Sequence, residues 1–256
     1  MNDLQKYFED NDKRLIDKWM HYFDVYDRHF NKYRNREVAI LEIGVSQGGS
    51  LQMWKSYFGE KAKIYGIDID PRCKQFEEDN IEIFIGSQSD RQFLNEIKNT
   101  IPKVDILIDD GGHTMNQLIV SYEELFSHIK DDGVYLAEDL HTCYWLEYGG
   151  GHKRNGTFIE YSKNFIDKLH AFHSEQSSLQ ISDFTKQVNS IHYYDSIVVI
   201  EKKIREKPFT RTTGNPSFIV ENVKRDKVDR FKRDLKKGKN KLLRFFNLSG
   251  SDLFNT

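Results

Sequence analysis

The chain has 256 residues, 38% hydrophobic and 30% charged, with a formal net charge of −2, as expected for one large domain with short additions. No apolar run reaches the roughly 18 residues that a membrane span needs, and the charged start lacks the apolar core of a secretory signal. The two cysteines form no metal or redox motif. We therefore expect a cytoplasmic protein without a membrane-spanning segment.

The first 36 residues are predicted to be helical. Their apolar and aromatic residues recur at spacings of three and four, as on one face of a helix. These residues are Leu15, Trp19, Tyr22, Phe23, Tyr26 and Phe30. We expect an N-terminal helical segment at 1–36.

Residues 37–205 are predicted to form an α/β domain with a Rossmann-like, doubly wound sheet. Short apolar runs predict five buried strands, at Val38–Ile43, Ile64–Ile67, Ile81–Ile85, Val104–Ile108 and Val134–Ala137. Helical stretches separate or follow them, at Ser50–Tyr57, Arg72–Asp79, Asp90–Asn99, Thr114–Ile129 and Thr157–His173. This alternation predicts a parallel sheet covered on both faces. The runs Ile191–Tyr194 and Ile197–Lys202 predict an antiparallel hairpin, which completes a seven-stranded sheet.

The loop after the first strand is a candidate cofactor site. Its small residues let the backbone approach a ligand near a helix N-terminus; they are Gly44, Ser46, Gly48 and Ser50. A dinucleotide loop would have glycine at the position of Ser46, and Glu42 suits a cationic sulfonium better than a pyrophosphate. An ordinary strand-to-helix turn is the alternative.

Other strand ends supply further candidate cofactor contacts. Asp68 can accept both hydroxyls of a ribose, whereas Asp70 fits a helix cap before Pro71 better. An adenine edge would lie at Ser87 and Gln88, after the third strand. Asp109, at the end of the fourth strand, completes this set.

Acidic residues follow the fourth and fifth strands. Because ligands bind beyond the carboxyl ends of the strands of such a sheet, we expect five side chains to meet: Asp109, Asp110, His113, Glu138 and Asp139. Carboxylates this close repel unless a cation neutralises them, and oxygen ligands favour Mg²⁺, Mn²⁺ or Ca²⁺. Helix caps and solvated loop charges are the alternative, and His141 and His152 read as ordinary surface residues.

Two segments lie outside these motifs. In the irregular stretch 139–156, Tyr144 and Trp145 are candidates to stack on a substrate ring, or else are ordinary packed aromatics. In the tail, 206–256, the segment from Lys224 to Arg244 holds eleven Lys and Arg against three Asp, so it carries +8 and the rest of the chain −10. The acidic body argues against nucleic-acid binding.

The tail is predicted to contain a basic amphipathic helix. Its apolar residues share one helical face: Val228, Phe231, Leu235 and Leu242, with Phe245 and Phe246 closing the segment. Such a helix can lie on an anionic membrane surface. Packing on the acidic body or on a second subunit is the alternative.

Four motifs carry a resemblance to a known family. LEIGVSQGGS, YGIDIDP, IDDGGH and EDLHTCYW, in this order and spacing, resemble the class I methyltransferases that use S-adenosylmethionine. More narrowly, they are similar to the bacterial sugar O-methyltransferases, which include the mycinamicin VI and rhamnosyl enzymes, and to the related cephalosporin-hydroxylase-like proteins. The resemblance covers about residues 15–203 and includes Asp17–Lys18 and His21–Tyr22.

This resemblance implies a magnesium-assisted methyl transfer to a sugar or glycan hydroxyl. By position, Asp110, Glu138 and Asp139 correspond to the family's metal ligands and His113 to its base. The sequence departs from the family at Gly112, where serine is usual, and at Ser87, where aspartate is frequent. A non-sugar hydroxyl or phosphoryl acceptor, a metal-dependent hydrolase and a non-catalytic scaffold remain as alternatives; the oligomeric state stays open.

Overall fold

The computed structural model describes residues 1–218 and 227–245. The chain divides into one unit at Met1–Pro208 and a second at Phe209–Thr256. The predicted N-terminal segment and α/β domain both lie within the first unit.

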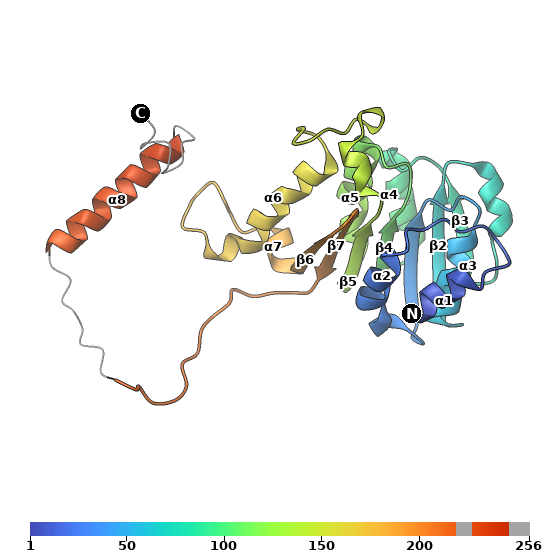
Figure 1. Ribbon diagram of the computed structural model, residues 1–256, viewed down its shortest axis with the longest axis horizontal. Coiled ribbons are helices and arrows are strands. Elements are labelled where there is room, and N and C mark those ends of the chain that lie inside the picture. Colours follow the sequence, from blue (N-terminus) through green and yellow to red (C-terminus); the bar gives the residue numbers. More distant parts are fainter. Residues whose placement is uncertain (219–226, 246–256) are drawn as a thin grey trace. The chain divides into compact units, whose positions relative to one another are not determined.

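A seven-stranded sheet forms the centre of the first unit (Figure 1). Its strands, in the order β3-β2-β1-β4-β5-β7-β6, are β1 (Val38–Ile43), β2 (Ala62–Asp68), β3 (Ile81–Ile85), β4 (Val104–Asp109), β5 (Ile129–Ala137), β6 (Val188–Tyr194) and β7 (Ile197–Lys202). Strands β1 to β5 are parallel, whereas β7 pairs antiparallel with both β5 and β6. The predicted doubly wound sheet and its C-terminal hairpin are confirmed.

Helices cover both faces of this sheet. One face packs against α1 (Asp3–Glu9), α2 (Tyr22–Phe30) and α3 (Gly49–Phe58), the other against α4 (Arg91–Thr100), α5 (Met115–Leu125), α6 (Phe158–His170) and the short α7 (Asp183–Gln187). Alternate side chains of a strand point to opposite faces, so Ile40 lies in the first core and Leu41 in the second. The strand ends therefore stand between two packed layers.

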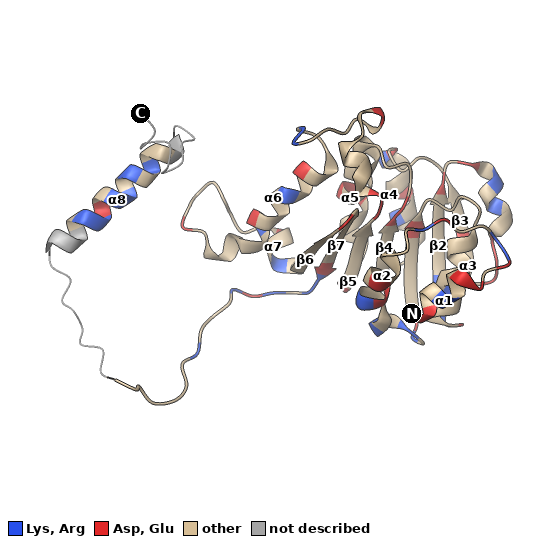
Figure 2. Cartoon of the chain, viewed as in Figure 1, with Lys and Arg blue, Asp and Glu red and all other residues tan. Residues whose placement is uncertain are grey.

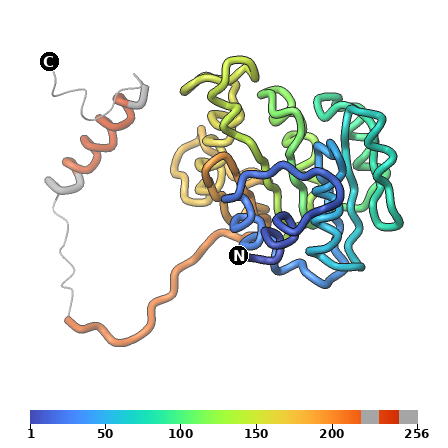
Figure 3. The backbone as a smooth tube through the Cα atoms, turned by 45° about the vertical axis from the view of Figure 1, so that its right-hand side comes forward, coloured from blue at the N-terminus to red at the C-terminus, as the bar shows by residue number. Residues whose placement is uncertain are grey.

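The sequence predicted helix throughout the N-terminal segment, but the structure does not form one continuous helix there. Residues 10–21, between α1 and α2, form no helix, and Leu15 and Trp19 are 69% and 55% exposed. The intervening segment instead crosses the domain beside the start of α3, where a side chain at Gly49 would lie 2.3 Å from the Leu15 carbonyl (Figure 3). Leu15 and Trp19 line a cavity there, so their helical spacing does not reflect core packing.

A smaller correction concerns the predicted helix at Arg72–Asp79. The structure has only a 3₁₀ helix there, Pro71–Phe76, and it is capped by Asp70, whose side chain accepts from the backbone N–H of Arg72. The capping role expected for Asp70 is confirmed.

The second unit contains one described helix, α8 (Lys227–Phe245). Lys and Arg residues run along it (Figure 2), and Phe231, Leu235 and Leu242 are exposed. The predicted tail helix is therefore present; Phe246 and the side chains of Val228 and Phe245 lie outside the described residues. Among the described helices, none combines the length and the apolar character required to cross a membrane.

Candidate active site

The loop between β1 and α3 is shaped by positions where side chains are excluded or strained. Gly44 has φ +96°, and a Cβ there would lie 1.9 Å from the Asp110 carbonyl oxygen, so only glycine lets these two loops touch. Gly48 precedes α3 with φ +71°, and Ser46 is a non-glycine residue at φ +48°. Strain of this kind clusters at ligand sites.

The Asp68 carboxylate ties this loop to the end of β2. Its Oδ2 accepts from the backbone N–H groups of Val45 and Ser46, both at 2.9 Å, and its Oδ1 accepts from Asp70 N at 2.9 Å. Beside it, the buried Gln88 donates to Asp109 Oδ1 at 3.0 Å and accepts from Gly112 N at 2.7 Å. Together these contacts join the loops that follow four strands, β1, β2, β3 and β4.

Two predicted cofactor residues lie beneath the loops rather than on the cavity walls. Glu42 is fully buried and accepts from Ser50 Oγ at 2.8 Å and Trp54 Nε1 at 2.9 Å. Asp109 is also fully buried and accepts from Ser121 and Gln88. Burial raises the pKa of each carboxyl to about 7. A direct contact of either with a cofactor stays a prediction.

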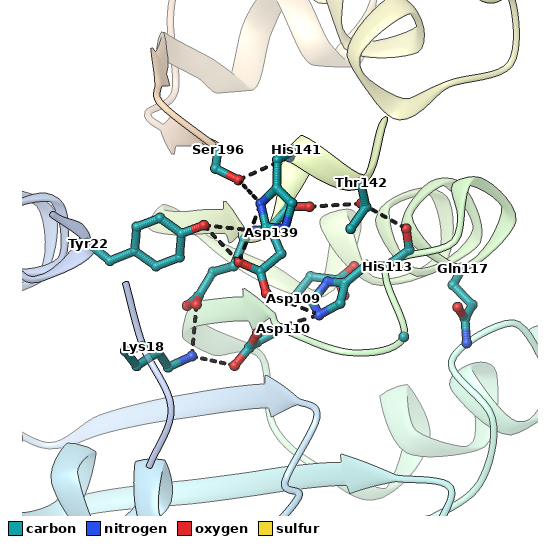
Figure 4. Close-up of polar contacts among 12 residues, drawn as sticks. Lys18, Tyr22, Asp109, Asp110, His113, Gln117, Asp139, His141, Thr142 and Ser196 are labelled. Atoms are coloured by element: carbon teal, nitrogen blue, oxygen red, sulfur yellow. Dashed lines mark hydrogen bonds and ion pairs between the residues drawn. The ribbon is translucent and has the colours of Figure 1, made fainter. Parts of the chain in front are cut away.

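Four of the five side chains expected to meet beyond β4 and β5 do so, namely Asp110, His113, Glu138 and Asp139, and a buried lysine joins them (Figure 4). Asp109 lies in the interior instead, bound to Gln88 and Ser121. Lys18, from the non-helical segment, donates to Asp110 Oδ2 and, at 2.8 Å, to Glu138 Oε2. Burial and the neighbouring Asp110 raise the pKa of Glu138 to about 8. Burial alone would lower the pKa of Lys18, but the two carboxylates raise it well above its usual value. One ammonium thus faces two carboxyl groups.

His113 and Asp139 approach each other at the exposed side of this cluster. His113 Nε2 lies 3.4 Å from Asp139 Oδ2 and 3.8 Å from Asp110 Oδ1. Both His113 and Asp139 have positive φ, 55° and 53°, a left-handed conformation that is uncommon outside glycine. Tyr22 of α2 donates to Asp139 Oδ1 at 2.8 Å. Burial lowers the pKa of His113, so the neutral, proton-accepting form is favoured.

An aromatic group borders the cluster. His141, expected to be ordinary surface, packs edge-on against both Trp19 and Trp145, at centroid distances of 5.7 and 4.7 Å, and contacts Ser196 Oγ through Nδ1 at 2.6 Å. Trp145 and the predicted substrate residue Tyr144 are both about half exposed. The rings of Tyr144 and Trp145 are accessible to a ligand. The sequence had not indicated that Trp19 or His141 would lie beside the site.

Two adjoining cavities open at these strand ends. The first, about 320 Å³, is lined by residues 15–19, Tyr22, the β1–α3 loop and the acidic group Asp110, His113, Glu138 and Asp139. The second, about 240 Å³, is lined by Asp68, Gly86–Gln88 and Gln117, among others. Gly44, Ser46, Asp110 and Gly111 line both. Because the two cavities adjoin and have different linings, they suit a ligand with two chemically different halves.

The donor set suits a hard divalent cation. Ligand atoms of Asp110, His113 and Asp139 lie within 4.8 Å of one another. The Glu138 side chain is more deeply buried than these three and accepts a hydrogen bond from Lys18. Mg²⁺ prefers oxygen ligands. The cluster has three carboxyl groups and one ammonium, that of Lys18, so a further positive charge would be stabilised there.

Known proteins are similar to this chain in sequence. No family model matches the chain. It is 36% identical over 207 residues to demethylmacrocin O-methyltransferase of Streptomyces fradiae, covering 75% of this chain and 52% of that protein. It is 35% identical over 196 residues to mycinamicin VI 2''-O-methyltransferase of Micromonospora griseorubida, covering 72% and 49%. The chain thus spans about half the length of the curated relatives it matches.

Solved structures of methyltransferases also resemble this chain. The MycE methyltransferase from mycinamycin biosynthesis, in complex with Mg, SAH and mycinamycin VI, superposes with a TM-score of 0.70 at 30% identity, covering 90% of this chain and 58% of that one. Another crystal form, with Mg and SAH, gives a TM-score of 0.69 at 32% identity over 78% and 54%.

Proposed function

The chain has the fold of a class I methyltransferase and is a homologue of bacterial sugar O-methyltransferases, and from this premise we propose that it transfers a methyl group from S-adenosylmethionine to a hydroxyl of a sugar or glycan. The observation that carries the proposal is the pair of cavities that meet at Gly44 and Asp110. One is lined by groups suited to a nucleoside and the other by an acid–base cluster.

The second cavity is the proposed nucleoside site. Asp68 would offer its carboxylate oxygens to the ribose hydroxyls, and Ser87 and Gln88, which line the same cavity, would contact the adenine. The methionine half would then extend along Gly44–Ser50 into the first cavity, near the backbone N–H groups that begin α3. Glu42 and Asp109 would act from beneath, by holding Ser50 and Gln88.

His113 is the proposed base. Bound S-adenosylmethionine supplies an electrophilic methyl group, so the chain's own task is to orient the acceptor and take up its proton. His113 Nε2 receives that proton, and the carboxylates of Asp110 and Asp139, at 3.8 and 3.4 Å, stabilise the imidazolium that forms. Thr142 Oγ1 donates to the His113 carbonyl at 3.1 Å and helps to hold its strained backbone.

Asp110, Glu138 and Asp139 are the proposed magnesium ligands. A divalent cation at this position supplies Lewis acidity that lowers the pKa of a nearby hydroxyl. Because Mg²⁺ favours oxygen over imidazole, His113 stays available as the base. Tyr22 and Lys18 orient Asp139 and Glu138 through their hydrogen bonds.

The proposed acceptor is a sugar that reaches the first cavity past the aromatic border. Trp19 and Trp145 offer exposed faces, and Tyr144 lies next to Trp145 in the same loop. A hydrolase would have no need of Glu42 and the glycine loop, and a non-catalytic scaffold would have no need of His113 and its three carboxylate neighbours. A non-sugar hydroxyl or phosphoryl acceptor is the second candidate, because the described cavity residues include no sugar-specific pattern.

The tail adds a proposal about location. The basic helix α8, with its exposed Phe231 and Leu235, has the composition of a helix that lies on an anionic membrane. A cytoplasmic enzyme held at the inner face of the membrane would be near lipid-linked glycans. Packing of the helix on a second copy in a homo-oligomer is the competing arrangement.

Calorimetric titration with S-adenosylhomocysteine (SAH), with and without Mg²⁺, tests the proposal. We expect binding in about the micromolar range, and separate binding of Mg²⁺ that weakens in Asp139→Asn. The exposed loop variant Lys153→Gln serves as the control and should bind both ligands as the wild type does. Absence of SAH binding by the wild-type protein would refute the assignment.

A further inference from the structure

A second group of metal-ligand side chains lies where α2 meets the β6–β7 hairpin. It consists of His29 from α2, His192 from β6 and Glu201 from β7. The two imidazole rings have centroids 4.7 Å apart. One ligand atom from each of the three residues lies within 4.8 Å of the others. None of these residues lines either active-site cavity.

Three separate elements bring this group together. In the hairpin, Ser190 pairs with Glu201 and His192 with Val199, which places His192 diagonally across from Glu201 on one face of the pair. His29 stands on the buried face of α2 and is 3% exposed. Its Nδ1 lies 2.9 Å from Glu201 Oε1, and His192 Nε2 lies 3.8 Å from Glu201 Oε2. Each ring thus has a nitrogen directed at one oxygen of the same carboxylate.

Neighbouring hydroxyls orient the ligand atoms. Tyr194 OH lies 2.9 Å from His29 Nε2, which leaves Nδ1 as the nitrogen that faces the carboxylate. Ser190 Oγ donates to Glu201 Oε2 at 3.0 Å and also lies 3.0 Å from His192 Nε2. His29 is thus held through Nε2, the ring nitrogen that does not face the carboxylate, as is usual for metal-binding histidines. At His192 the Ser190 contact is to Nε2, the nitrogen that also faces Glu201, so a bound metal would take the place of that contact.

We propose that His29, His192 and Glu201 form a zinc-binding site. Bonds of about 2.0–2.2 Å in a tetrahedron place ligand atoms roughly 3.3 Å apart. The separations of 2.9 and 3.8 Å, which involve the two different oxygens of Glu201, bracket this value. With one ligand atom taken from each residue, all three lie within 4.8 Å of one another, so zinc binding would draw them closer. The side chains of His192 and Glu201 are 36% and 26% exposed, so water can complete the coordination.

Ligand chemistry separates this site from the acidic cluster. Two imidazoles with one carboxylate suit Zn²⁺, whereas an oxygen-rich set suits Mg²⁺. The site would bind α2 to the hairpin through three elements. Because Tyr22 of the same helix donates to Asp139, zinc would stabilise a helix that positions an active-site residue. The proposed role is structural, with no contact to the reacting groups.

Titration of the full chain with Zn²⁺ tests this inference. Saturating Mg²⁺ is present throughout to occupy the acidic cluster, and isothermal calorimetry gives the stoichiometry and affinity. His192→Ala and Glu201→Gln change partly exposed residues and should fold, which circular dichroism checks. His152→Ala removes an exposed loop histidine and is the matched control, and His113→Ala reports any zinc bound at the active site.

We expect wild type, His152→Ala and His113→Ala to bind one zinc ion that His192→Ala and Glu201→Gln bind at least about tenfold more weakly. Zn²⁺ should raise the melting temperature of the wild type but not that of His192→Ala. Substituted Co²⁺ should show the visible absorption of a four-coordinate ion only where His192 is intact. Zinc binding that is absent in the wild type, or unchanged in His192→Ala and Glu201→Gln, would overturn the proposal.

Discussion

Lys18 Nζ lies 2.8 Å from Glu138 Oε2, although 120 positions separate the two residues in the chain. The same ammonium contacts Asp110, and its side chain is almost fully buried. A buried charge without a partner is costly, so the crossing segment 10–21 and the ends of β4 and β5 depend on each other.

Replacing Lys18 by Met should destabilise the protein in EDTA. The substitution leaves two buried carboxyl groups without their cation, and breaking a buried ion pair typically costs about 3–5 kcal/mol of unfolding free energy. Chemical denaturation measures this loss. Mg²⁺ should recover more stability in Lys18→Met than in the wild type, because it can replace the missing charge; Lys18→Arg, which keeps the charge, should lose less. Equal stability of Lys18→Met and wild type in EDTA would show that Lys18 is not the counter-ion.

The sheet could be predicted from the sequence because each strand is a short apolar run beside a helical pattern. The N-terminal segment could not. Leu15 and Trp19 continue the three- and four-residue spacing of α2, but they border a cavity, and spacing does not distinguish a cavity wall from a core. Only the buried aromatic residues within α2 followed the expected pattern.

Part of the candidate site could be predicted from the sequence, because the order of the strands determines which strand ends lie together. Strand-end carboxylates are expected to converge in a doubly wound sheet, and Asp110, Glu138 and Asp139 do. Which strand-end side chain faces a ligand and which faces the interior depends on the loops above, so Glu42 and Asp109 appear buried. Partners such as Lys18 and His141 arise from tertiary contacts that local spacing does not encode.

Asp68→Asn should weaken SAH binding by about 1–3 kcal/mol, the range for a lost hydrogen bond to a charged group. The carboxylate accepts from Val45 N and Ser46 N and lines the second cavity, so both the loop and the ribose contact depend on it. Calorimetry gives the dissociation constant. Asp70→Asn is the control, since Asp70 caps the neighbouring 3₁₀ helix and does not line that cavity. Equal affinities for SAH in the two variants would remove Asp68 from the cofactor site.

His113→Ala should lower kcat by about 10²–10⁴-fold, the usual contribution of a general base, while SAH binding changes little. The reason is that His113 lines only the first cavity, beside Asp110 and Asp139. The rate is measured with any sugar that the wild type methylates, and His152→Ala controls for loss of a histidine.

The methyl transfer should also depend on a divalent metal. EDTA should abolish methyl transfer by the wild type, and Mg²⁺ should restore it. Full activity in EDTA would take the metal out of the mechanism and leave His113 as the sole activator.

The full chain should float with anionic vesicles at low salt and not with neutral ones. Near an anionic surface each cation contributes about 1 kcal/mol before screening, and α8 adds the exposed side chains of Phe231, Leu235 and Leu242. Flotation with phosphatidylglycerol and phosphatidylcholine vesicles measures the effect. The double variant Phe231→Glu/Leu235→Glu should lose binding, since it places charge on the apolar face, and a chain ending at Pro208 should stay soluble. If the wild-type chain and the double variant both remain with the soluble fraction on anionic vesicles, the helix does not bind membranes, and packing on protein is the role left for it.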